Sequence, residues 1–258
     1  MRLLHVHPGG HGYGWRAPRW PDHKFSLYVS HIDAAAFSTK VDLRPECPPI
    51  YDQGQEGSCT GNAWAGLGQF LTMKLGLPNF VPSRQAIYWW ERELEGDTVD
   101  DTGASLTDGA RVTSTKGCPH EDLWPYDISK MAVQPSAAVV VDGLKHLVAQ
   151  PQQVHQDLNS MKAVLVNGYP IAIGFTVFES FESPAVASTG VVPMPGRHEA
   201  VLGGHAVLVV GYDDSSARFI VRNSWGARWG MSGYFTIPYA FLVNPRLATD
   251  FWTASEIR

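Results

Sequence analysis

The chain has 258 residues, of which 44% are hydrophobic and 17% charged, so it is long enough to bury a large core. A formal net charge of −5 argues against the broad basic surface that binds nucleic acid, and we expect no polynucleotide partner. The longest apolar runs, 137–141 and 206–211, have the length of strands and fall far short of the roughly 18 residues of a membrane span, so we expect no membrane partner.

Residues 1–40 are expected to form an N-terminal arm. The first 20 residues are rich in glycine and show neither helical nor strand periodicity, which is typical of a loose, solvated tail. Their apolar stretch ends after Leu4, so no secretory signal is recognised; a cytoplasmic location is the default expectation, and export stays open. His5, His7 and His11 lie on this arm without a carboxylate or thiolate beside them, so we expect no metal site.

From Val41 the composition is that of a folded domain, with four helical signals followed by four strand-like runs. The first two helices are predicted at 58–75, with Ser58 as N-cap, and at 83–95. A third is predicted after a capping box at Ser105 and Asp108, and a fourth at 156–166. Strands are predicted at 170–178, 205–212, 218–224 and 233–238. This order predicts an α+β protein with a helical lobe at about 41–150, a β-rich lobe at about 151–258 and a cleft between them.

The three cysteines, Cys47, Cys59 and Cys118, are too few and too widely spaced for a disulfide framework or a zinc site. Their odd number leaves at least one free thiol. Cys59 lies between glycines at the start of a predicted helix, where the helix dipole favours the thiolate and so a nucleophile. A buried, inert cysteine is the alternative reading of that position.

Two downstream residues could activate such a thiol. His205 opens a predicted strand after two glycines, and Asn223 ends the next strand in the segment NSWGARWG. An amide oxygen that accepts from one imidazole nitrogen would fix the tautomer and aim the other nitrogen at Cys59. Considered alone, His205 is more typical of a structural histidine whose hydrogen bonds are satisfied, and Asn223 is more typical of a turn.

Together, four segments in this order resemble the papain-like cysteine peptidases. They are QGQEGSCTGNAW at 53–64, GCPHEDLWPY at 117–126, GGHAVLVVGYD at 203–213 and FIVRNSWGARWGMSGYFTI at 219–237. The resemblance implies a two-lobed papain-like fold, a peptide or protein substrate, no cofactor and a monomer.

The resemblance also implies roles for single residues. Cys59 would be the nucleophile, His205 the general base and acid, and Asn223 the residue that orients the imidazole. Gln53 would complete an oxyanion hole with the backbone N–H of Cys59, whereas Gln55 has the wrong spacing. The expected substrate-binding residues are Gly57, Ser58, Gly103, Ala104, Gly174, Gly204 and Trp225. This small-residue lining predicts a roomy pocket that tolerates bulky side chains.

The chain departs from the family pattern near the nucleophile. Glu56 stands where secreted relatives have a half-cystine, and Thr60 replaces a common tryptophan. The neighbouring disulfide is therefore absent, which fits a reducing compartment and a bacterial-type member, with Cys47 and Cys118 as free thiols. Glu56 could also raise the pKa of the nearby thiol by repulsion.

The expected activity is that of a cysteine endopeptidase that works through a thioester. The same triad could instead serve transpeptidation or amide and ligase chemistry, or the chain could be a catalytically silent peptide-binding module. The presence of all four residues, Gln53, Cys59, His205 and Asn223, argues against the silent module. The arm is too short for a full inhibitory prosegment, so we expect a short pro-segment or cleft cap that docks through Trp15, Trp20 and Phe25 and acts as an intramolecular inhibitor.

Overall fold

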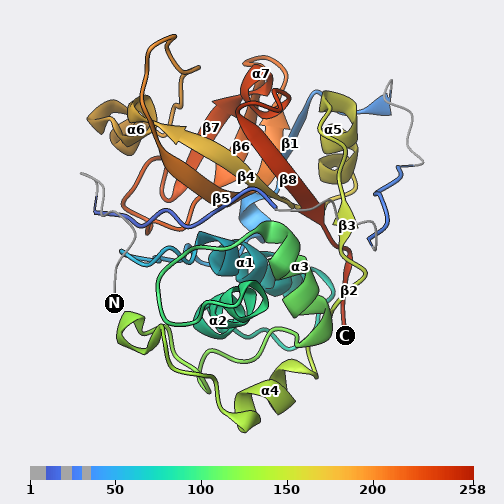
Figure 1. Cartoon of the computed structure of the whole chain (residues 1–258). Coiled ribbons are helices and arrows are strands. Elements are labelled where there is room, and N and C mark those ends of the chain that lie inside the picture. Colours follow the sequence, from blue (N-terminus) through green and yellow to red (C-terminus); the bar gives the residue numbers. More distant parts are fainter. Residues whose placement is uncertain (1–9, 19–24, 31–35) are drawn as a thin grey trace.

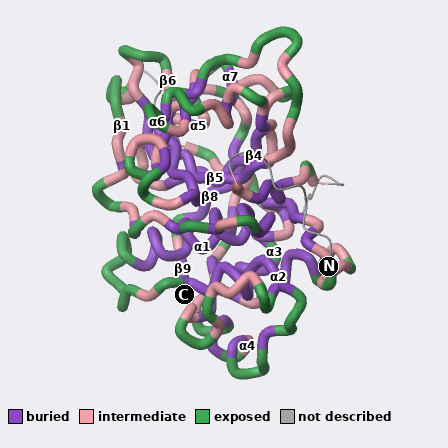
Figure 2. Tube along the Cα trace, turned by 90° about the vertical axis from the view of Figure 1, so that its left-hand side faces the viewer, coloured by how far each residue is buried: buried purple, intermediate pink, exposed green. Residues whose placement is uncertain are grey.

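The computed structural model describes residues 10–18, 25–30 and 36–258. Among the described residues, the first four helices gather in one half of the molecule, and an antiparallel sheet fills the other together with three short helices, among them α6, Pro184–Thr189, and α7, Tyr239–Leu242 (Figure 1). This arrangement confirms the predicted α+β class. In Figure 2 the buried backbone runs through the central helix α1 and the central strands, whereas the exposed positions lie on the outer loops.

Helix α1, Cys59–Lys74, is the central helix of the helical half, and every residue from Cys59 to Thr72 is buried. It lies against helix α2, Arg84–Glu95, and against the sheet strand β5, Val201–Asp213. Burial on all sides explains why the sequence of α1 is apolar and small around its whole circumference. Ser58 is the N-cap residue of α1, as predicted, but its side chain makes no capping hydrogen bond, because the hydroxyl bonds the Tyr126 hydroxyl instead.

The other predicted helices form close to their expected limits. Ser83 caps α2 by accepting from the N–H of Ala86, and Ser105 caps helix α3, Leu106–Thr115, by accepting from the N–H of Asp108. The Ser105 hydroxyl also donates to the Asp108 carboxylate, so the two residues of the predicted capping box contact each other through their side chains. Helix α5, Leu158–Val166, begins two residues later than expected, because Asp157 supplies its N-cap.

The sheet has seven strands, with β3, β8, β4, β5, β6 and β7 in that order and β1 paired to β5. The predicted strands are β4, Ile171–Phe178; β5; β6, Arg218–Arg222; and β7, Tyr234–Pro238. The expectation that His205 opens its strand is wrong, because β5 begins at Val201, and His205 lies within it and is fully buried. Strands β1, Lys40–Asp42, β3, Gln152–Gln153, and β8, Ala248–Thr253, were not predicted. β8 pairs with β4 and so brings the end of the chain beside the centre of the sheet.

Two further features differ from the sequence-based expectation. The apolar run at 137–141 is not a strand but part of helix α4, Ala137–Gly143, which lies at the outer edge of the helical half and leaves Val141 exposed. The chain also crosses between the halves at both ends, because β1 joins the sheet and strand β9, Glu256–Ile257, pairs with β2, Val148–Ala149. No helix of the described residues is long and apolar enough to cross a membrane.

The N-terminal arm is not a solvated tail over residues 10–18. This segment, blue in Figure 1, lies between the helical half and the sheet, with Gly12, Tyr13, Gly14 and Trp15 all buried. Phe25 packs edge-on against Trp252 at 4.8 Å between ring centroids. Trp20, His5 and His7 lie outside the described residues.

Candidate active site

Cys59 is the first residue of α1 and is fully buried. Its thiol faces the backbone N–H groups of Ala206, in strand β5, and of Gly14, in the arm. Burial raises the pKa of Cys59 to about 12, although these N–H groups favour the thiolate. At neutral pH the thiol is therefore protonated while the arm is in place.

His205 and Asn223 are brought together by the pairing of β5 with β6. The His205 Nε2–H donates to Asn223 Oδ1 at 2.8 Å, and the same oxygen accepts from the N–H of Ser224. Among the described residues, His205 Nδ1 has no hydrogen-bond partner. Trp225 stacks on the imidazole with 4.8 Å between ring centroids. Burial lowers the pKa of His205 to about 4, so this ring is neutral at pH 7.

Gln53 is fully buried and its amide has a fixed orientation. Its Oε1 accepts from the Ser224 hydroxyl at 2.6 Å, so Nε2 is the atom that points toward the arm. Gln53 Nε2 donates to the carbonyl of Glu56 at 2.9 Å and to the carbonyl of Gly12 at 3.1 Å. Gln55, the competing glutamine, is exposed.

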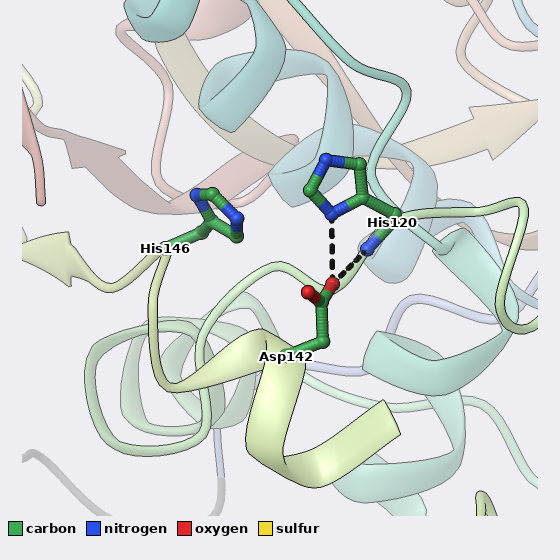
Figure 3. A group of neighbouring side chains, drawn as sticks. All are labelled: His120, Asp142 and His146. Carbon is green, nitrogen blue, oxygen red and sulfur yellow. Dashed lines mark hydrogen bonds and ion pairs between the residues drawn. The ribbon is translucent and has the colours of Figure 1, made fainter. Parts of the chain in front are cut away.

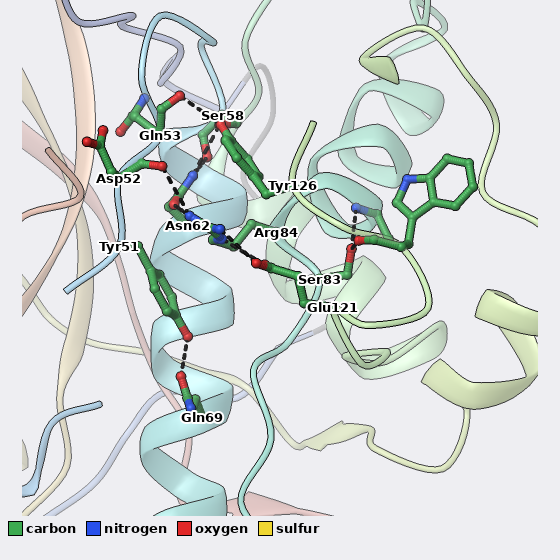
Figure 4. Close-up of polar contacts among 12 residues, drawn as sticks. Tyr51, Asp52, Gln53, Ser58, Asn62, Gln69, Ser83, Arg84, Glu121 and Tyr126 are labelled. Carbon is green, nitrogen blue, oxygen red and sulfur yellow. Dashed lines mark hydrogen bonds and ion pairs between the residues drawn. The ribbon is translucent and has the colours of Figure 1, made fainter. Parts of the chain in front are cut away.

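A polar network behind Gln53 holds its loop (Figure 4). Arg84 forms a two-pronged ion pair with Glu121 and donates to the carbonyl of Asp52 at 3.2 Å. Its guanidinium lies 4.1 Å from the centroid of the Tyr126 ring. The Tyr126 hydroxyl in turn donates to the carbonyl of Gln53 at 2.9 Å. Arg84 and Tyr126 are therefore positioning residues for this loop. The sequence analysis missed Arg84, which lies in no motif, and assigned no role to Tyr126, although it ends the segment GCPHEDLWPY.

Several of the expected substrate-binding residues contact the arm through their backbone. Ala104 donates to the carbonyl of Gly14 at 2.7 Å and accepts from the N–H of Arg16 at 2.9 Å. The carbonyl of Gly204 accepts from the N–H of Trp15 at 3.0 Å. Gly103 accepts from the Arg16 guanidinium, and its φ of +73° requires glycine.

The remaining predicted binding residues divide into two groups. Trp225 stacks on His11 of the arm at 4.4 Å, and the backbone of Gly57 packs against Gly14 so closely that a Cβ on Gly14 would lie 1.5 Å from the Gly57 carbonyl oxygen. The Ser58 hydroxyl makes no hydrogen bond to the described residues of the arm; it bonds the hydroxyl of Tyr126 and accepts from Asn62 Nδ2. Its side chain therefore braces the loop rather than facing a ligand.

A pocket for a bulky side chain holds Trp15. The indole lies over Gly174 and Gly204, where a Cβ would come within 1.9 Å and 2.6 Å of its ring carbons. Its Nε1–H donates to Asp250 Oδ2 at 3.3 Å. Asp250 is also bonded by the N–H of Leu106, so the carboxylate is both buried and hydrogen-bonded. Sequence reasoning missed Asp250. Trp252 donates to it from two residues away, but its other partners, Leu106, Thr107 and Trp15, are more than 140 residues away along the chain.

The expected repulsion of the thiolate by Glu56 is not present. The Glu56 side chain is fully buried and accepts from Gln85 Nε2 at 2.6 Å, and the carboxylate that raises the pKa of Cys59 is Glu91. Burial raises the pKa of Glu56 to about 7. Cys47 and Cys118 are free thiols, as expected from the sequence.

The comparison with known proteins bears directly on this site. The model of the papain family of cysteine proteases matches residues 37–241. The chain belongs to this family. The protein is thus a hydrolytic thiol protease with the papain-like fold that the sequence predicted.

Relatives of this protease include proteins from several distant sources. It is 38% identical over 235 residues to a peptidase C1-like protein of Acanthamoeba polyphaga mimivirus, with 88% of this chain and 76% of the relative covered. It is 31% identical to a cathepsin B-like protein of Giardia intestinalis, over 80% of this chain and 71% of that protein. Among solved structures, xylellain, a cysteine protease from Xylella fastidiosa, matches with a TM-score of 0.89 and 36% identity, covering 96% of this chain and 97% of that one.

Proposed function

We propose that this papain-family protease hydrolyses internal peptide bonds with Cys59 as nucleophile, His205 as general base and acid, and Asn223 as the orienting residue. The observation that carries the proposal is the His205–Asn223 hydrogen bond beside the first residue of α1. It uses Nε2 of the ring and leaves Nδ1 without a partner among the described residues, so one nitrogen is held and the other is available for proton transfer.

The reaction then follows from the chemistry of these groups. His205 Nδ1 takes the Cys59 proton as sulfur attacks the peptide carbonyl carbon. Negative charge develops on the carbonyl oxygen, where Gln53 Nε2–H and the Cys59 N–H donate to it. The imidazolium protonates the leaving amine, which breaks the C–N bond and leaves a thioester. Water, deprotonated by His205, attacks the thioester and releases the acid and the thiol.

We also propose that residues 1–40 act as an intramolecular inhibitor. The carbonyl of Gly12 accepts from Gln53 Nε2, the donor assigned to the oxyanion, and Trp15 fills the bulky pocket. The arm further keeps water from Cys59 and His205, and burial disfavours the thiolate–imidazolium pair on which attack depends. Displacement of the arm would therefore expose the cleft and lower the pKa of Cys59.

The experiment is to treat the chain, and a truncated chain that starts at Phe37, with an epoxide thiol-protease inhibitor and to map the modified residue. This truncation keeps β1 and the contact of Ser38 with Tyr212. We expect modification of Cys59 alone, faster in the truncated chain, and loss of peptide hydrolysis in Cys59→Ala. Full peptide hydrolysis by Cys59→Ala would refute the assignment of Cys59 as the nucleophile. Product analysis with added amines would reveal transfer in place of hydrolysis.

A further inference from the structure

A second cluster of chemically active side chains lies in the helical half, outside the active site. It consists of His120, in the loop after α3, and of Asp142 and His146, at the end of α4 and just beyond it (Figure 3). One ligand atom from each of the three lies within 4.8 Å of the other two. The proposed peptidase reaction uses none of them.

The backbone around this cluster is held on both sides. Cys118 N–H donates to the carbonyl of His146 at 3.0 Å, and His146 N–H donates to the carbonyl of Gly143 at 2.8 Å. The N–H of His120 donates to Asp142 Oδ2 at 2.9 Å, and His120 Nδ1 lies 2.7 Å from the same oxygen. The three side chains therefore start from fixed backbone positions.

An aromatic ring orients the two imidazoles. Phe80 stacks on His120 at 4.1 Å and lies 4.5 Å from His146, between ring centroids. The two imidazoles are edge-to-face at 4.9 Å. A cover of this kind limits the orientations of the ring nitrogens and keeps water from one side of the cluster. Asp142 is 8% exposed, and both histidines are partly exposed, so an ion could reach the open side.

We propose that His120, Asp142 and His146 bind one divalent transition-metal ion, with Zn²⁺ as the expected ion. Two imidazoles and one carboxylate suit Zn²⁺ and disfavour Mg²⁺ and Ca²⁺, which prefer oxygen ligands. Ligand atoms at about 2.0–2.2 Å from a tetrahedral ion lie roughly 3.4 Å apart. The hydrogen-bonded contact between His120 Nδ1 and Asp142 Oδ2 is shorter, at 2.7 Å, and no two of the three ligand atoms are more than 4.8 Å apart, so the side chains would shift to bind one ion.

The Asp142 carboxylate is held by groups of the same cluster. Its Oδ2 accepts from the backbone N–H of His120 at 2.9 Å and lies 2.7 Å from His120 Nδ1. Lys145 competes for this carboxylate, because its ammonium lies 3.7 Å from Asp142 Oδ1 on an exposed side chain.

The bound ion would link the loop after α3 to the end of α4. This inference does not depend on the proposed triad, because Figure 1 places α4 at the far end of the helical half from the sheet. The expected effect is on stability, since an ion that binds only the folded chain raises the melting temperature. The fourth coordination position would be taken by water.

The test is a Zn²⁺ titration of full-length Cys59→Ala, followed by calorimetry and by thermal unfolding. This background removes the active-site thiol as a competing ligand. We expect one Zn²⁺ per chain and a rise in melting temperature. His146→Ala should weaken Zn²⁺ binding at least about tenfold. Removal of a residue that only hydrogen-bonds a metal ligand already costs about that much affinity, and His146 would be a ligand itself. Lys145→Ala should tighten it, because the competing ammonium is gone.

Matched variants separate this site from other imidazoles. His198→Ala, at an exposed histidine, and the double variant His5→Ala/His7→Ala should keep both the affinity and the thermal shift. His146 makes no side-chain hydrogen bond within the described residues that its loss would leave unsatisfied, so His146→Ala should fold. Absence of Zn²⁺ binding, or binding that survives His146→Ala and is lost in the double variant, would overturn the proposal.

Discussion

The inhibitory arm makes a quantitative prediction at Trp15. Trp15 is 9% exposed, and its indole is enclosed by Gly174, Gly204 and the Asp250 carboxylate. Trp15→Ala would keep the main-chain hydrogen bonds to Ala104 and Gly204 but would empty this pocket. The arm should then leave the cleft more often, and the catalytic groups should become accessible to substrate.

The magnitude follows from the burial of the side chain. Truncation of a buried tryptophan to alanine costs about 3–5 kcal/mol. Since about 1.4 kcal/mol corresponds to a tenfold change in an equilibrium constant, the open fraction should rise by roughly 10² to 10³. The apparent affinity for substrate scales with that fraction, so kcat/KM should rise by the same factor. It cannot exceed the value of the chain that starts at Phe37, in which the cleft is open throughout.

The assay is the initial rate of hydrolysis of a fluorogenic peptide at low substrate concentration. Gly14→Ala provides a second way to displace the arm, because its Cβ would lie 1.5 Å from the Gly57 carbonyl oxygen. Gly196→Ala is the matched control, since its Cβ would meet nothing closer than 3.8 Å. We expect both arm variants to approach the truncated chain and the control to match the parent.

One result would refute this reasoning about the arm. If Trp15→Ala, Gly14→Ala and the truncated chain all have the kcat/KM of the parent, the arm does not limit access to the cleft. An inactive truncated chain whose Cys59 still reacts with the epoxide would instead count against the proposed peptidase chemistry. The two proposals therefore fail in different ways.

Three other predictions concern single buried side chains. Gln53→Ala in the truncated chain should lower kcat about 10²- to 10³-fold through loss of an oxyanion donor, whereas Gln55→Ala, at an exposed glutamine, should leave kcat unchanged. Equal effects of the two substitutions in steady-state kinetics would exclude Gln53 as the oxyanion donor. Alkylation of Cys59 by iodoacetamide at pH 7 should be slow in the full chain, because burial raises the thiol pKa to about 12, and it should be faster in the truncated chain. Equal labelling rates in the two chains would contradict the proposal that the arm raises this pKa. Glu56 has a folded-state pKa of about 7 against an ordinary value of 4.5, so its contribution to stability is present below pH 4.5 and is lost as the pH rises through 7. Glu56→Gln should flatten this decline and raise the free energy of unfolding at pH 8 by about 3 kcal/mol. The measurement is denaturant titration of Cys59→Ala with and without Glu56→Gln, and the same decline with pH in both chains would exclude this role of Glu56.

The local pattern of the sequence predicted the helices and strands that carry the candidate catalytic residues. The apolar spacing after Ser58 predicted α1 with Cys59 at its start, and the β-branched runs predicted the strand that holds His205 and the strand that ends just before Asn223. These features depend on residues a few positions apart, for which hydrophobic period and turn chemistry are sufficient. The apolar run of α4 was ambiguous for the same reason, because five residues do not distinguish a short helix from a strand.

The sequence by itself therefore determined the α+β class, the family resemblance and the four residues of the proposed peptidase chemistry. Only the tertiary structure decided what surrounds them: the arm in the cleft, Asp250 beneath Trp15, and Arg84 behind the Gln53 loop. These contacts join segments far apart in the chain, and the partners of a buried polar group cannot be read from its neighbours in sequence. The arm in particular binds through main-chain groups and close glycine contacts, and such contacts leave no hydrophobic period in the sequence.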